Sequence, residues 1–163
     1  MTRAQYRQLC RFFVAGRFAT DLGVIQTLKI ANPLRRGQAR YRHRIDLHWT
    51  SEDAVARYVH IAHTLWRPAA PVGLAAVLHV QQVRHKLAAH KAILITNTCF
   101  TRPAIAAAED DGIALFVVRP AFDHTKLTTD RPRLLACQMR RLVPADAALY
   151  TYEAVHRHDQ HPV

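Results

Sequence analysis

The pattern of apolar and polar positions changes period several times along the chain and predicts alternating helices and strands. Apolar residues recur every three to four positions in two segments, which predicts helices from Arg3 to about Thr20 and from Val72 to Ala89. Segments that alternate, or that are short and wholly apolar, predict strands. These strands are residues 24–30, 45–49, 57–65, 92–95 and 133–143, and a short element at 149–155 follows them. The strands at 45–49 and 57–65 are close enough for a hairpin.

The segment from His90 to Leu115 predicts a strand, a polar turn, a helix and a second strand. Thr101 can cap the helix, Pro103 suits its first turn, and Gly112 can end it in a left-handed conformation. A strand, helix and strand within so few residues predict a right-handed parallel crossover. The chain is therefore expected to belong to the α/β class.

Length and composition predict one domain. A chain of 163 residues, half of them apolar, can bury a core without disulfides. We expect a single domain over residues 1–155 and a disordered tail over 156–163. No window is long and apolar enough to predict a membrane span. Three scattered cysteines fit a reducing compartment, and we expect a cytoplasmic protein of a bacterial cell. The arginine-rich amphipathic start leaves a mitochondrial targeting sequence as the alternative.

The charge is strongly positive, and arginine outnumbers lysine. Lysine and arginine total 23 against 12 acids, which gives a formal charge of +11. Such a balance favours a nucleic-acid partner, although a basic protein from an arginine-rich proteome would share it. The arginines from Arg35 to Arg42 form a polar run that leads into the strand of Asp46.

Three segments resemble the Mrr-like restriction endonuclease domain of the PD-(D/E)xK nuclease superfamily. Residues 41–46 (Y-R-H-R-I-D) are similar to the family's catalytic-aspartate strand, and residues 61–67 (I-A-H-T-L-W-R) occupy the place of its E-x-K strand. The strand, turn, alanine-rich helix and strand of residues 90–115 complete the likeness. The resemblance implies a restriction-endonuclease-like fold, with a mixed central sheet flanked by helices, and DNA as the partner.

The catalytic motif departs from the family pattern. In such nucleases the aspartate and the glutamate hold a divalent metal, usually Mg²⁺, and the lysine acts on the water or the phosphate. Asp46 keeps its family identity, whereas Ala62 stands at the glutamate and Thr64 at the lysine. Alanine cannot ligate a hard cation and threonine carries no positive charge. A register shifted by one residue would instead place Ile61 at the glutamate position and His63 at the lysine position. We expect no cofactor, or Mg²⁺ if the protein is active.

The resemblance places arginines beside the position of the scissile phosphate. The expected nucleic-acid-binding residues are Arg35, Arg36, Arg40, Arg42, Arg44 and Arg67. Arginine suits phosphate because its planar donors fork onto two oxygens. A homodimer or a partner subunit remains open.

The chain contains 11 histidines, which is enough to consider a transition-metal site. If the strands of Asp46 and His60 pair, Asp46, His48 and His60 can approach one another, because residues two apart on a strand share a face. A histidine-assisted metal site at these three residues is therefore one hypothesis, and polar surface histidines are the other. His79, His85 and His90 do not have the spacing that stacks ligands on a helix.

Other chemistries find little support. No glycine-rich phosphate loop and no G-x-S-x-G turn occur. Cys99 is a nucleophile candidate near a helix start, and Thr96 to Thr98 offer hydroxyls and amides to a phosphate.

Three functions follow from these observations. The first is a nucleic-acid-binding domain that no longer cuts. The second is an active endonuclease whose ligands have moved, with Asp46 helped by His48, His60, Glu52 or Asp53. The third is a protein-interaction module that inherited the fold.

Overall fold

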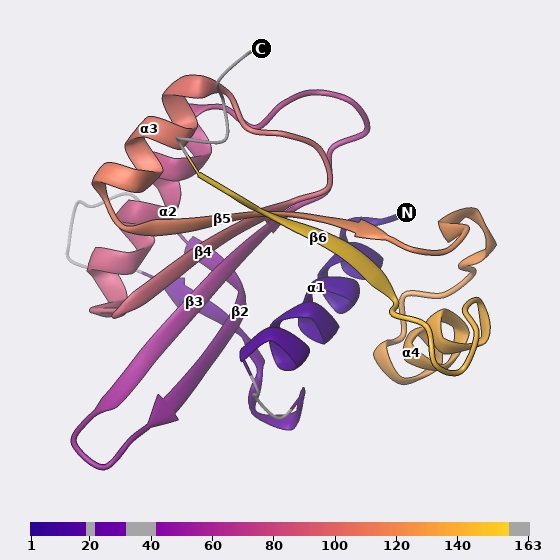
Figure 1. Ribbon diagram of the computed structural model, residues 1–163. Helices are drawn as coiled ribbons and strands as arrows, with labels where there is room; N and C mark the ends of the chain where they lie inside the picture. The colour runs from indigo at the N-terminus through magenta and orange to yellow at the C-terminus, as the bar shows by residue number, and fades with distance from the viewer. Residues whose placement is uncertain (19–21, 32–41, 157–163) are drawn as a thin grey trace.

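A mixed sheet forms the centre of the computed structural model, which describes residues 1–18, 22–31 and 42–156 (Figure 1). Within these residues the sheet has six strands that lie in chain order. They are β1 (Gln26–Ala31), β2 (Arg42–Glu52), β3 (Arg57–Leu65), β4 (Lys91–Thr96), β5 (Ile113–Pro120) and β6 (Tyr150–Val155). β3, β4 and β5 pair in parallel, and the other neighbours pair antiparallel. This arrangement confirms the mixed sheet and the α/β class.

Helices cover both faces of the sheet (Figure 1). They are α1 (Arg3–Phe18), α2 (Leu74–Leu87), α3 (Arg102–Asp110) and α4 (Pro132–Arg141). One apolar core lies between the sheet and α1 with α4, and a second lies between the sheet and α2 with α3. β4 contributes side chains to both cores. Ile93 and Ile95 enter the first, and Ala92 and Leu94 enter the second. A strand buried on both faces needs such a continuous apolar run.

The crossover predicted for residues 90–115 is present. β4 and β5 pair in parallel and α3 connects them. The Thr101 hydroxyl accepts a hydrogen bond from the Ala104 N–H, and Pro103 lies in the first turn. Gly112 adopts a φ of +62°, where a side chain would strain the backbone. Thr101, Pro103 and Gly112 therefore have the roles in α3 that were expected from the sequence.

The N-terminal elements are confirmed with shifted ends. α1 buries the expected apolar face and is described as far as Phe18. Residues 22–24 form a short 3₁₀ turn, so β1 begins at Gln26 rather than at Val24. β2 and β3 form the expected hairpin, but β2 runs from Arg42 to Glu52 and is much longer than residues 45–49. α2 starts at Leu74 because Val72 forms an isolated parallel bridge with Phe100.

The strand predicted over residues 133–143 is wrong, because this segment is the helix α4. Leu135 and Met139 are buried four residues apart, which is the spacing of a helix face. Pro132 opens the helix, and Arg140 and Arg141 lie in its last turn, where positive charge suits the helix dipole. These boundary signals outweigh the run of apolar residues from which a strand was expected.

An irregularity in β2 positions the candidate site. Gln26 of β1 pairs with His48 and Leu28 pairs with Ile45, so β2 has one residue more than its partner across this interval. As a result Ile45 enters the α2/α3 core, whereas Leu47 enters the α1/α4 core. The pairing with β3 reaches only as far as Leu47 opposite Ala62. Asp46 therefore lies at the point where β2 separates from β3.

Candidate functional site

The Asp46 carboxylate is almost fully buried and contacts groups from three elements. Its Oδ2 accepts a hydrogen bond from the Thr64 N–H at 3.0 Å and lies 3.0 Å from Nδ1 of His63, both on β3. Its Oδ1 lies 3.6 Å from Nε of Arg44 and 3.7 Å from Nη1 of Arg7 on α1. The residue is only 8% exposed. Both oxygens therefore already have protein partners.

These partners determine the charge state of Asp46. Burial alone would raise the pKa of its carboxyl. The hydrogen bond and charge of His63, the Thr64 N–H and the Arg44 guanidinium act in the opposite direction, and together they hold the pKa below its usual value. Asp46 is consequently ionised at neutral pH and is neutralised by the surrounding cations.

The two positions expected from the resemblance to stand at the family's glutamate and lysine carry no metal ligand in their side chains. Ala62 lies opposite Leu47 and is 1% exposed in the α1/α4 core. Thr64 is also buried, and its backbone N–H binds Asp46. A magnesium ion needs several oxygen ligands, including carboxylates. The residues present here, one carboxylate surrounded by cations and a methyl group, do not fit such an ion.

The histidines expected as ligands lie apart from the Asp46 carboxylate. The His60 ring stacks on Trp49 at 5.1 Å, and its Nε2 lies 2.7 Å from the Ser51 hydroxyl. His48 pairs with Ile61, beyond the irregularity in β2. That irregularity breaks the two-residue alternation from which a shared face was expected. Over the described ranges, no group of three or more His, Cys, Asp or Glu side chains is placed to hold a metal ion.

The displaced carboxylates considered from the sequence lie at the hairpin tip. Glu52 pairs with Arg57 at 3.5 Å, and the Asp53 carboxylate accepts hydrogen bonds from the N–H groups of Val55 and Ala56. Six residues of strand separate Glu52 from Asp46, which corresponds to roughly 20 Å. These acids stabilise the turn and do not complete a site at Asp46.

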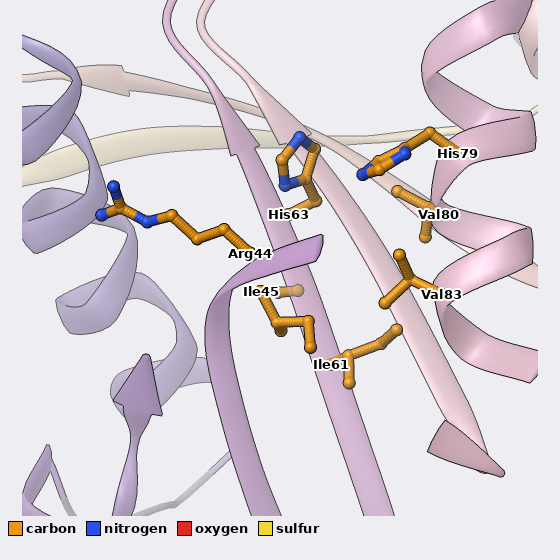
Figure 2. Close-up of a pocket in the computed structure, with 8 residues that line it drawn as sticks. Arg44, Ile45, Ile61, His63, His79, Val80 and Val83 are labelled. Carbon is orange, nitrogen blue, oxygen red and sulfur yellow. The ribbon is translucent and has the colours of Figure 1, made fainter. Parts of the chain in front are cut away.

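Of the arginines expected to bind nucleic acid, the structure describes the side chains of Arg44 and Arg67. Arg44 lies beside Asp46, and Figure 2 shows its side chain extending toward α1. Arg67 is exposed, and its backbone is bound through both N–H and C=O to the Asn97 amide. Arg35, Arg36 and Arg40 lie outside the described residues. Arg42 opens β2, but its side chain is not described.

The polar turn after β4 uses its hydroxyls on the protein's own backbone. Thr96 donates to the Leu65 carbonyl and Thr98 donates to the Ala70 carbonyl. Cys99 is exposed next to this turn. The roles proposed for these residues toward a phosphate or as a nucleophile stay predictions.

A row of histidines adjoins Asp46 and was not recognised from the sequence. The rings of His63 and His79 lie 5.4 Å apart, and those of His79 and His43 also lie 5.4 Å apart. Figure 2 shows His63 of β3 and His79 of α2 facing each other above Ile45, Ile61, Val80 and Val83. The cavity beneath them measures about 10 Å³, room for a single water molecule. The sequence pointed to His63 only through the shifted register of the E-x-K strand. Its neighbour His79 on α2 is brought close by the tertiary structure, which no sequence pattern indicates.

Comparison with known proteins identifies the fold family. A family described as restriction endonuclease (Mrr_cat) matches residues 33–120, which is more than half of the chain. A crystal structure of a protein of unknown function, AF1548, is similar with 17% sequence identity and a TM-score of 0.44; the match covers 67% of this chain and 56% of that one. No curated protein matches. Among the described helices, none has the length and apolar character needed to cross a membrane. The match over residues 33–120 shows that this chain belongs to the Mrr-type restriction endonuclease family.

Proposed function

We propose that this protein binds nucleic acid, with DNA as the first candidate, through a restriction-endonuclease-like domain that has lost metal-dependent cleavage. The observation that carries the proposal is the environment of Asp46. The carboxylate that the family uses for a metal here faces Arg7, Arg44 and His63, and its second oxygen also accepts the Thr64 N–H.

The substitution of cations for a metal site has a direct electrostatic consequence. A divalent ion would enter a position already occupied by two guanidinium groups, and it would gain no second carboxylate from Ala62 or Thr64. The same guanidinium groups each carry more donors than one carboxylate can use. They can therefore donate to a phosphate while they remain paired with Asp46.

The overall charge supports the same partner. The chain carries a formal charge of +11 and a pI near 10.4. A protein with this charge gains affinity for a polyanion by releasing counterions, so its binding weakens steeply as salt rises. A protein-interaction module would have no such dependence on salt.

The test combines cleavage and binding on one preparation. Plasmid and single-stranded DNA are incubated with the protein and Mg²⁺ or Mn²⁺, and the same samples are examined on binding gels at 50 and 200 mM salt (about the range over which phosphate contacts are resolved). We expect salt-sensitive binding without cleavage. Cleavage that disappears in Asp46→Ala would refute the loss of catalysis and would indicate relocated ligands. Absence of binding at low salt would leave the interaction module as the surviving function.

A matched pair of variants locates the contact. Arg44→Ala removes a guanidinium beside Asp46, and Arg141→Ala removes the same charge from the last turn of α4. If phosphate binds near Asp46, Arg44→Ala lowers the slope of log affinity against log salt by about 1. Arg141→Ala should leave that slope close to the wild-type value. Equal slopes for the two variants would place the nucleic acid elsewhere.

A further inference from the structure

Four basic side chains form a row that leads away from Asp46. His63 contacts Asp46, His79 contacts His63, and His43 contacts His79, with ring centroids 5.4 Å apart at both ring contacts. Nζ of Lys86 then lies 2.8 Å from Nε2 of His43. The row takes its members from β2, β3 and α2, and Figure 2 shows its beginning at His63 and His79. It is therefore a property of the fold and not of a single segment.

The helix α2 sets the length and direction of the row. His79 and Lys86 are seven residues apart, which is two turns of helix and about 10 Å. Val83 lies one turn from His79 and is buried in the core beneath. His79 and Lys86 thus lie on the side of α2 that faces β2, and His43 of β2 lies between them.

The three elements that carry the row are poor in negative charge. α2 and β3 contain no Asp or Glu, and β2 contains Asp46 and Glu52. Glu52 pairs with Arg57 at the hairpin tip, and Asp46 is already neutralised by Arg7 and Arg44. The local balance is positive even when every histidine is neutral.

Charge and geometry along the row favour an anion over a metal. Burial lowers the pKa of His79, and the charges of His63, His43 and Lys86 lower it further. Burial and Lys86 likewise lower the pKa of His43. Neutral rings are the form that ligates metals, but within the described residues no three such side chains converge on one point. A phosphate needs no such convergence, and it would favour the protonated rings. The ligand that fits the row is therefore an anion.

We propose that His79, His43 and Lys86 form a track that binds successive phosphates of one nucleic-acid strand and leads from Asp46 along α2. Successive phosphates of a strand advance by about 3.4 Å along a duplex axis but lie farther apart through space, so about two of them match the length of the row. The inference rests on the proposed function, because it names the path that the nucleic acid takes. It adds a proton dependence, because the two histidines bind a phosphate best when they are protonated.

The experiment measures DNA affinity by fluorescence anisotropy at about pH 7.5 and about pH 5.0 and at one ionic strength. The lower value stands well below the ordinary histidine pKa of about 6.5, because the pKa of His79 and of His43 is lowered. His79→Gln removes the central member of the row, and His85→Gln makes the same change at an exposed histidine of the same helix. We expect the affinity of the wild type for DNA to rise about tenfold at the lower pH. This is the change in affinity that one added hydrogen bond to a charged group typically produces. His79→Gln should lose most of this gain, and His85→Gln should keep it. Thermal denaturation of each variant verifies that it is folded.

The outcomes separate this inference from the proposed function. If the wild type shows salt-sensitive DNA binding on the gels, but His79→Gln and His85→Gln behave alike in anisotropy at both pH values, the track is refuted and nucleic-acid binding stands. If the wild type fails to bind DNA on the low-salt gels and in anisotropy at both pH values, the proposed function fails.

A second measurement tests the ligand class without DNA. The ring resonances of His79 are followed by NMR as inorganic phosphate, and separately Zn²⁺, is added to the wild type. A rise in the His79 titration midpoint with phosphate supports the anion track. A response to Zn²⁺ and none to phosphate would overturn it.

Discussion

Replacing Asp46 by alanine tests whether this carboxylate stabilises the folded protein. A conventional catalytic aspartate is a source of repulsion, and its removal leaves stability unchanged or improved. Here the carboxylate instead accepts the Thr64 N–H and faces Arg7, Arg44 and His63. We therefore expect Asp46→Ala to destabilise the protein, whatever its effect on DNA.

The magnitude follows from the contacts that are lost. The buried Thr64 N–H would lose its partner, which costs about 1–3 kcal/mol. Arg44 is half exposed, so its ion pair with Asp46 contributes only about 0.5 kcal/mol, and the less exposed Arg7 contributes about 0.5–1 kcal/mol. The sum is about 2–4.5 kcal/mol. For a chain of this length that corresponds to a fall in Tm of roughly 5–15 °C.

The assay is urea denaturation of wild type, Asp46→Ala, Asp46→Asn and the control Asp110→Ala, which removes an exposed carboxylate at the end of α3. Asp46→Asn retains acceptor oxygen and should lose less than Asp46→Ala. Because the pKa of Asp46 is lowered in the folded state, its contribution is present above the unfolded pKa of about 3.9 and is lost as the pH falls through the folded value. The reasoning is refuted if Asp46→Ala and Asp110→Ala have the same midpoint at pH 7.

Three further predictions concern the fold itself. Thr101→Ala removes the side-chain cap of α3 and should cost about 1 kcal/mol in urea denaturation, with no loss if the cap is dispensable. Gly112→Ala should cost about 1–2 kcal/mol through backbone strain alone, since the nearest atom to an added Cβ is 4.0 Å away; an unchanged Tm would contradict the positive φ. Because burial lowers the pKa of His79 and His60, these rings contribute stability above the unfolded pKa of about 6.5 that is lost as the pH falls through their folded values. The Tm should therefore fall between pH 7 and pH 5, and a flat profile would argue against the burial of these rings.

Local signals predicted most of the fold because they act within single segments. The Thr101 cap, Pro103 and Gly112 fix α3 through neighbours in the chain, and the apolar run of β4 needs no partner to be recognised. The segment after β5 was more difficult, since an apolar run there is compatible with either element. Its boundary residues, Pro132 at the start and Arg141 at the end, favour the helix over the strand.

The candidate site was predictable only in part. Asp46 and the neutral residues at positions 62 and 64 are visible in the sequence. The contacts of Asp46 with Arg7 and His63 are not visible, because one depends on the packing of α1 and the other on the irregularity in β2. The same irregularity separates His48 from the position expected by simple alternation.

The irregularity in β2 also determines where this chain can change length. Ile45 and Leu47 enter opposite cores only because of the extra residue between them, so deletion of one residue there would turn Leu47 and Trp49 away from the α1/α4 core. The turn from Asp53 to Ala56 has no such constraint, since Val55 at its tip is 92% exposed. Among relatives of this protein, insertions and deletions should therefore collect at the hairpin tip, and the spacing from Ile45 to Trp49 should stay fixed even where Asp46 itself has been replaced.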